Sequence, residues 1–190
     1  MSNFYFYHLR AEANHNRDLL SALEATDLSI WGVFTGLFGL ASNEVYVVLT
    51  EDDQEMQRVV SNAQTQVVRC EPWQPTARPT DPGVLSEPGL YVFRSFLIQA
   101  KDVDELVELS QRAWETFETN EDYQTKPVGL FRPLDQGDQV PMQLVTWYDG
   151  FDSWEKSRTP APDAIENFRR RHALTSTSNA VATRLVQPRR

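Results

Sequence analysis

The sequence predicts an α+β protein that is a tandem duplication of a βαββαβ unit, with two antiparallel sheets packed as an α/β barrel. The same order of strand-like and helix-like segments occurs twice along the 190 residues. Residues 72–89, rich in proline, glycine and polar side chains, separate the two copies as a linker. The strand-like segments carry apolar side chains on both alternating sets, which indicates that both faces of each sheet are buried.

The first copy covers residues 1–71. Runs of β-branched and aromatic residues between turn-forming residues predict its four strands, at 4–9, 31–40, 44–50 and 65–70. A short helix is expected around Leu19 and Leu23, which lie on one helical face. A second helix is expected at 52–63, where helical spacing puts an apolar stripe on one side.

The second copy covers residues 90–190. Strands are predicted at 90–98, 128–134, 141–148 and 180–186, and the serine-rich residues 175–179 are predicted to form a loop. A long helix follows Asp102, and its apolar stripe consists of Val103, Leu106, Val107, Trp114 and Phe117. Shorter helices are expected after Asp152 and Asp163.

Each copy thus has the ferredoxin-like order of elements. A sheet covered by helices on one face leaves its other face to be covered by the second sheet. The resulting barrel should have a cleft in its middle, and it can close within one chain or between chains.

Composition and charge limit the partners. The hydrophobic content of 41% is enough for a sizeable core, and no run approaches the roughly 18 apolar residues that span a bilayer. The start has neither the basic nor the long apolar region of a signal peptide, and the single cysteine, Cys70, excludes an internal disulfide. We therefore expect a cytoplasmic protein without a membrane partner. The net charge of −9 argues against nucleic acid, although a basic run stands at 169–171.

Residues 90–158 resemble the NIPSNAP-like members of the dimeric α/β-barrel superfamily. The domain of those proteins opens with a strand of the type Tyr-Glu-Leu-Arg-Thr-Tyr, and Tyr91, Arg94 and the aromatic Phe96 match it here. Tyr148 and Asp149 match the end of a later motif, His-x-Trp-x-Tyr followed by Asp. The resemblance implies the barrel fold and a homo-oligomer.

The chain also departs from the family pattern. Val92 stands where the family usually has Glu, and Leu144 and Thr146 stand where the His and Trp would be. The superfamily includes haem enzymes, cofactor-free monooxygenases, isomerases and members without an assigned activity. The resemblance therefore predicts the fold and leaves the reaction open.

Arg94 is the first candidate catalytic residue. A strand interior flanked by Phe93 and Phe96 is a costly place for a guanidinium, so Arg94 needs solvent, an acidic ligand or a salt bridge to a local carboxylate. His8 falls at the matching place of the first copy. If both point into the central cleft, a cation and a base there would bind and deprotonate a small acidic substrate.

Four aromatic residues are predicted to line the cleft: Tyr91, Phe96, Trp147 and Tyr148. Trp147 and Tyr148 alternate along a strand, so only one of them can face it, and both can instead belong to the core. The leading hypothesis is a protein that binds a small, partly apolar molecule without a cofactor, as a cofactor-independent monooxygenase or an isomerase.

Two other functions compete with it. A single histidine suffices as the axial ligand of haem, and His172 shares an apolar helical face with Ile165 and Phe168, although such a histidine can equally be an ordinary half-buried or exposed one. The second alternative is a non-catalytic oligomeric interaction protein whose cleft is filled by its own side chains. No metal site is predicted, because the three histidines and one cysteine are scattered.

Overall fold

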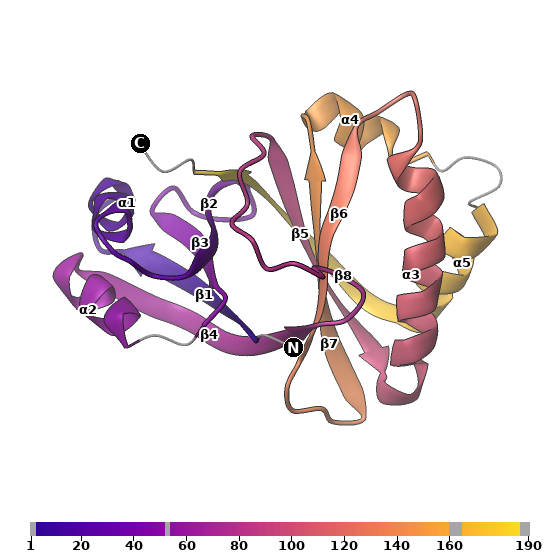
Figure 1. The fold of residues 1–190 in the computed structure, drawn as a ribbon, viewed down its shortest axis with the longest axis horizontal. Coiled ribbons are helices and arrows are strands. Elements are labelled where there is room, and N and C mark those ends of the chain that lie inside the picture. Colours follow the sequence, from indigo (N-terminus) through magenta and orange to yellow (C-terminus); the bar gives the residue numbers. More distant parts are fainter. Residues whose placement is uncertain (1–2, 52–53, 160–164, 187–190) are drawn as a thin grey trace.

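The computed structural model describes residues 3–51, 54–159 and 165–186, and it confirms the predicted fold class. Within these residues, eight strands form one closed barrel in the order β1-β3-β2-β8-β5-β7-β6-β4 (Figure 1). No helix in the described part of the chain is long and apolar enough to cross a membrane.

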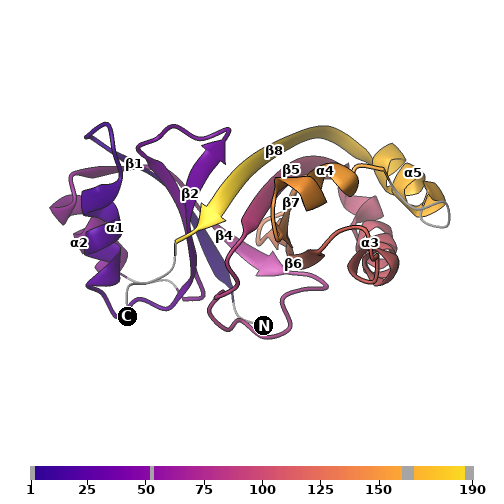
Figure 2. The same ribbon diagram turned by 90° about the horizontal axis from the view of Figure 1, so that it is seen from above.

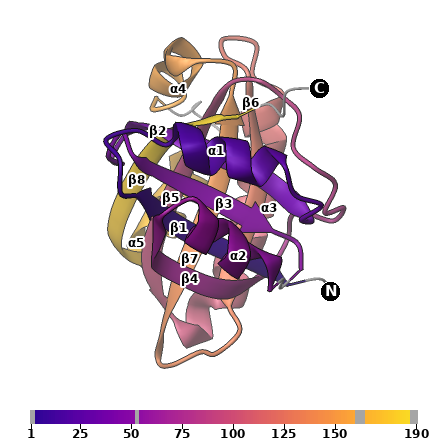
Figure 3. The same cartoon turned by 90° about the vertical axis from the view of Figure 1, so that its left-hand side faces the viewer.

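The first half contributes strands in the order β4-β1-β3-β2. Its elements are β1 (Phe4–Ala11), α1 (Arg17–Glu24), β2 (Ile30–Phe38), β3 (Glu44–Leu49), α2 (Glu55–Asn62) and β4 (Thr65–Pro75). Figure 3 shows α1 and α2 lying across the outer face of this sheet. Leu19 and Leu23 of α1 and Met56 and Val59 of α2 are buried against the strands, as their helical spacing predicts.

The second half contributes strands in the order β8-β5-β7-β6. Its elements are β5 (Leu90–Gln99), the short 3-10 helix η1 (Ala100–Asp102), α3 (Val103–Glu118), β6 (Thr125–Pro133), β7 (Gln139–Tyr148), α4 (Phe151–Lys156), α5 (Ile165–Leu174) and β8 (Thr175–Leu185). The helices α3 and α5 stand together on the outer face of this sheet (Figure 1).

The barrel closes within one chain. Strand β8 runs from α5 back to the first half and pairs with β2, as Figure 2 shows, with Phe34 opposite Leu185. On the other side β4 pairs with β6, with Trp73 opposite Pro133. Both sheet edges are thereby satisfied without a second copy of the chain.

Two predicted loops turn out to be strand. Residues 72–75 were assigned to the linker, but β4 continues to Pro75 and its Trp73 pairs with Phe4. Residues 175–179 begin β8, where Ser178 pairs with Phe96 of β5. Backbone groups of the neighbouring strands need hydrogen-bond partners, those of β1 and β6 beside residues 72–75 and those of β5 beside residues 175–179. This long-range demand overrides the loop-like composition.

Aromatic side chains fill the interior of the barrel. The ring centroids of Phe4 and Phe6 lie 5.1 and 5.0 Å from that of Phe131, edge to face. The buried members of this interior cluster are Phe4, Trp31, Phe34, Val48, Trp73, Tyr91, Phe93, Phe131, Val145, Val181 and Leu185. Large rings therefore occupy the middle of the barrel, where the sequence predicts a cleft, and a cavity borders this cluster only at its side, beside Tyr91 and Trp147, within the described structure.

Candidate functional site

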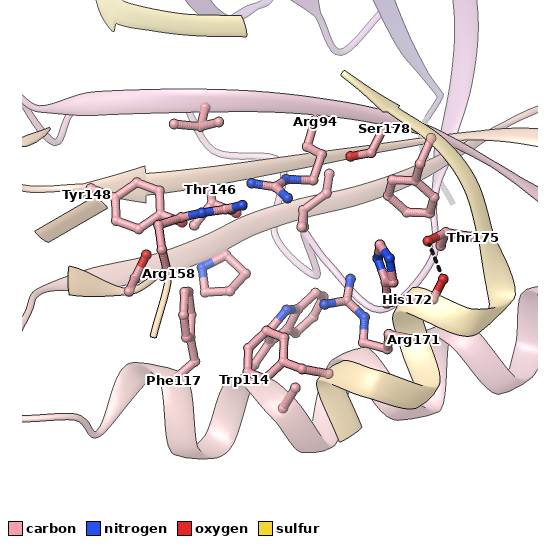
Figure 4. A pocket seen from close by; sticks show the side chains of 17 residues that line it. Arg94, Trp114, Phe117, Thr146, Tyr148, Arg158, Arg171, His172, Thr175 and Ser178 are labelled. Atoms are coloured by element: carbon pink, nitrogen blue, oxygen red, sulfur yellow. Dashed lines mark hydrogen bonds between the residues drawn. The ribbon is translucent and has the colours of Figure 1, made fainter. Parts of the chain in front are cut away.

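A cavity of about 310 Å³ lies in the second half, between the outer face of the sheet and the helices α3 and α5 (Figure 4). We call it the outer pocket. Its lining combines aromatic walls with cationic and hydroxyl groups: Val92, Arg94, Phe96, Ala113, Trp114, Phe117, Pro127, Leu144, Thr146, Tyr148, Ser157, Arg158, Phe168, Arg171, His172, Thr175 and Ser178.

Strand alternation in β5 places Arg94 in this pocket. Tyr91 and Phe93 point into the barrel and belong to its aromatic core. Arg94 and Phe96 have the opposite phase, so they face α3 and α5. The site predicted around Arg94 thus lies outside the barrel.

Three arginines from three different elements point into the outer pocket (Figure 4). Arg94 comes from β5, Arg158 follows α4, and Arg171 belongs to α5. Among the described residues, no salt bridge joins any of them to a carboxylate. The alternative that Arg94 is held by a local carboxylate is therefore wrong for the described part of the chain.

Burial makes these charges costly. Burial, together with the nearby charge of Arg94, lowers the pKa of Arg171 to about 10. Burial also lowers the pKa of Arg94, and the charge of Arg158 adds to this effect. The Nε atom of Arg171 is buried without a hydrogen-bond partner in the described structure. The pocket thus holds positive charge that nothing described in the protein neutralises.

The three consecutive arginines of α5 leave the helix in different directions. Arg170 donates two hydrogen bonds to Glu105, at 2.6 and 2.9 Å, and Arg169 is exposed with Glu166 at 4.0 Å. Arg171 lies one turn after Phe168 on the pocket side. Of the basic run at 169–171, Arg171 alone lines the outer pocket.

Tyr148 provides a buried hydroxyl in the same pocket, because its side chain on β7 is only 5% exposed. Burial raises the pKa of Tyr148, although interactions with Ser157 and the charge of Arg94 oppose this. The phenol therefore stays protonated near neutral pH and can donate a hydrogen bond to a ligand.

His172 lines the outer pocket at the end of α5, one residue after Arg171 (Figure 4). Its carbonyl accepts a hydrogen bond from the Thr175 hydroxyl at 3.2 Å, at the junction of α5 and β8. The imidazole is thus on the same side of the sheet as Arg94, where its nitrogens can contact a ligand.

His8 lies elsewhere. It has the phase of Phe4 and Phe6 on β1, and its Nε2 is 3.3 Å from Oε2 of the buried Glu44. Its ring packs edge to face on Tyr46, with the centroids 5.2 Å apart. The expectation that His8 and Arg94 share one cleft is wrong, because their side chains leave opposite faces of the barrel wall.

The four predicted aromatic residues divide between two cavities. Phe96 and Tyr148 line the outer pocket, whereas Tyr91 and Trp147 line a second cavity of about 590 Å³ beneath residues 84–87. There the Tyr91 hydroxyl donates to the Glu87 carbonyl at 2.9 Å, and Trp147 Nε1 donates to the Pro88 carbonyl at 3.1 Å. As predicted, only one of Trp147 and Tyr148 faces the pocket of Arg94.

Sequence reasoning missed several pocket residues, above all Arg158 and Arg171. The spacing that placed His172 beside Phe168 also places Arg171 there, so a helical wheel would have found it. Nothing local marks Arg158. No group of three or more His, Cys, Asp or Glu in the described residues could hold a metal ion.

No family model and no curated protein matches this chain. Several solved structures, in contrast, have a similar fold. An anthrone oxidase-like protein is similar over 98% of this chain and 92% of its own, with 12% identity and a TM-score of 0.61. A haem-degrading enzyme from Listeria monocytogenes is similar over 94% of this chain and 97% of its own, with 10% identity and a TM-score of 0.52.

A ferredoxin fold protein from Listeria monocytogenes, related to antibiotic biosynthesis monooxygenases, is similar over 98% of this chain and 96% of its own. Its identity is 10% and its TM-score 0.55. Similarities at such low identity concern the fold and not the reaction. The architecture of this chain is that of the ferredoxin-like α/β barrels.

Proposed function

We propose that this protein binds a small, partly apolar molecule in the outer pocket. The observation that carries the proposal is the lining, in which the aromatic Trp114, Phe117 and Phe168 face the polar Arg94 and Tyr148 across one cavity. Ligand pockets typically combine apolar walls with a few convergent polar groups, and a volume of about 310 Å³ is at the small end of their range.

The lining indicates which residues would contact the apolar and the polar parts of the ligand. The rings of α3 and α5 would cover the apolar part of the ligand, at roughly 25 cal/mol for each Å² removed from water. Arg94 and Tyr148 on the sheet would fix its polar end. The leading hypothesis from the sequence is thereby kept, but its site moves from the barrel interior to the outer pocket.

Blocking the pocket tests this proposal. Ser178 is exposed on β8 and its side chain faces the pocket, so Ser178→Trp should fill the cavity without disturbing the core. Asn179→Trp is the matched control, because the next residue on a strand points to the other face. A panel of bicyclic aromatic probes, acidic and neutral, should show ligand-observed NMR binding to the wild type and to Asn179→Trp, but not to Ser178→Trp. Binding that survives in Ser178→Trp would contradict the proposal.

Proton abstraction is the chemistry we propose for this site. His172 would remove a proton next to a carbonyl, and Arg94 would stabilise the resulting anion. This step begins an isomerisation or a cofactor-independent oxygenation. His172→Gln should then abolish deuterium uptake from solvent into a ketone probe such as 2-indanone, while the affinity for the probe remains. Unchanged uptake would refute His172 as the base.

Haem binding is the second candidate, and the position of His172 in the outer pocket favours it. Several side chains of the lining suit the polar groups of the cofactor: His172 would supply a nitrogen ligand, and the buried Nε of Arg171, which has no hydrogen-bond partner among the described residues, would bind a propionate. Trp114 would contact the macrocycle. Haem, when bound, supplies one-electron and oxygen chemistry. A haem-degrading enzyme among the similar structures supports this candidate at the level of the fold.

An absorbance titration with haemin separates the two candidates. Haem binding predicts a sharp stoichiometric Soret band that is lost in His172→Ala and kept in His15→Ala, a control at an exposed histidine before α1. A featureless spectrum would leave the cofactor-free pocket as the proposal.

Three finer expectations belong to the same proposal: a NIPSNAP-like protein, a location in the cytoplasm and a homo-oligomer. The motif around Arg94 supports the first, and the single cysteine supports the second. Native mass spectrometry tests the third. The rival reading, a non-catalytic interaction protein, predicts that no probe in the panel binds.

A further inference from the structure

We propose that the ligand of the outer pocket is an acid, and that Arg94, Arg158 and Arg171 form a clamp for a carboxylate carried on an aromatic or otherwise apolar body. This inference rests on the proposed function and narrows its ligand class. With a neutral ligand, the three cations of the pocket would have no counter-charge among the described residues.

The charge balance of the pocket is the first argument. The whole chain has a net charge of −9, yet among the described residues the titratable side chains that line the outer pocket are three arginines, one histidine and one protonated tyrosine. Carboxylates elsewhere do pair with arginines, as Glu105 does with Arg170 and Glu118 with Arg78. Since buried charges are normally paired, an unpaired group of this kind indicates a partner that comes from outside the protein.

The placement of the guanidinium groups is the second argument. Arg94 projects from the sheet and Arg171 from the opposite helix, so the two approach the cavity from opposite walls (Figure 4). Arg158 is exposed and lies at the rim, with its guanidinium 5.8 Å from the ring centre of Trp154. Planar guanidinium forks match the two oxygens of a carboxylate.

Desolvated donors are the third argument. The Nε–H of Arg171 is buried and finds no acceptor in the described structure. The charge of Arg94 lowers the pKa of Arg171, and the charge of Arg158 lowers the pKa of Arg94, so an anion among these guanidinium groups would oppose both effects. The protonated hydroxyl of Tyr148 adds a neutral donor from β7. Donors therefore surround the space where the carboxylate would lie.

Calorimetric titration with two probes of the same shape tests the clamp. 2-Naphthoate carries the carboxylate, and 2-naphthamide replaces it with a neutral amide. The wild type should bind 2-naphthoate roughly 10- to 100-fold more tightly than the amide, as expected for charge-assisted hydrogen bonds. Arg94→Met and Arg171→Met should each remove most of this preference.

Arg169→Met is the matched control. It removes the same charge from the same helix, but Arg169 is exposed and outside the pocket, so the preference for the acid should remain. If this variant also lost the preference for the acid, that preference would come from the overall positive charge of α5, and the clamp would be refuted.

The remaining outcomes separate this inference from the proposed function. If both probes bind equally and Ser178→Trp blocks both, the outer pocket is a ligand site but the clamp is refuted. If neither probe binds the wild type, the clamp and the proposed function fall together.

Discussion

The two halves of the chain build the same unit but use the layer between sheet and helices differently. In the first half, Leu19 of α1 and Met56 of α2 pack against Leu9 and Val47 of the sheet, and all four are fully buried. In the second half, α3 and α5 stand over Arg94 and leave a cavity of about 310 Å³. One copy of the duplicated unit serves packing, and the other carries the candidate site.

This contrast indicates where such a barrel can acquire a ligand site. Both copies give their inner faces to one shared aromatic core, so a change there disturbs the two sheets together. The outer faces are independent of each other. A polar substitution on one outer face, such as Arg94, needs only its own helices to adapt.

The largest effect is expected from placing an arginine in the packed layer between the sheet and the helices of the first half. Leu9 lies on the outer face of β1, as Arg94 does on β5, but it is fully buried among apolar side chains. Leu9→Arg would bury a charge without a partner or a cavity, and we expect it to lower the free energy of unfolding by about 4 kcal/mol or more. Urea unfolding measures this, with Arg94→Leu as the reciprocal variant. A loss below about 1 kcal/mol would show that the layer between sheet and helices in the first half can accommodate a charge.

Truncating a side chain in each layer should show the next largest difference. Leu19→Ala leaves a cavity in a packed core and should cost about 3 kcal/mol. Phe168→Ala removes a half-buried ring that already borders a cavity, and should cost about 1 kcal/mol. Equal losses in denaturant unfolding would contradict the contrast between the two layers.

A smaller effect of opposite sign is expected at Arg171. The Nε of Arg171 is buried and has no hydrogen-bond partner among the described residues, so Arg171→Met should stabilise the ligand-free protein and raise the free energy of unfolding by about 1 to 2 kcal/mol. The exposed Arg169→Met should change it by less than about 0.5 kcal/mol. Destabilisation by Arg171→Met would mean that the arginine has a structural partner.

The smallest effect is expected in the pH dependence of stability, through Glu44 of the first half. Burial opposes the charged form of Glu44, but the Ala41 N–H, Arg10 and His8 favour it, and the net result is a pKa below the usual 4.5. A lowered pKa in the folded state contributes stability above the unfolded pKa, and this contribution is lost as the pH falls through the folded value. Between about pH 5 and about pH 3, the wild type should therefore lose more stability than Glu44→Gln. Parallel curves would contradict this role of Glu44.

The order of elements could be predicted because its signals are local. The alternation of apolar residues along a strand, and the apolar stripe along a helix such as α3, can each be seen within a single segment of the sequence. The start of β8 could not be predicted in this way, because residues 175–179 become strand only through their pairing with β5.

The faces of the strands could not be predicted from the order of elements alone. Aligning the copies by order equated His8 with Arg94, and a shift of one residue along a strand moves a side chain to the other face. Tyr7 and Leu9 share the outer face with Arg94, whereas His8 does not. Arg158 enters the site through tertiary structure only.

Chemical-shift mapping with 2-naphthoate tests the central claim, that the ligand site is the outer pocket and not the barrel interior. Trp114 lines the outer pocket, whereas Trp31 and Trp73 belong to the interior core. We expect the probe to shift the indole resonance of Trp114 and the Nε–H resonance of Arg171, and to leave those of Trp31 and Trp73 unchanged. Shifts confined to Trp31 and Trp73 would place the ligand inside the barrel and contradict the account.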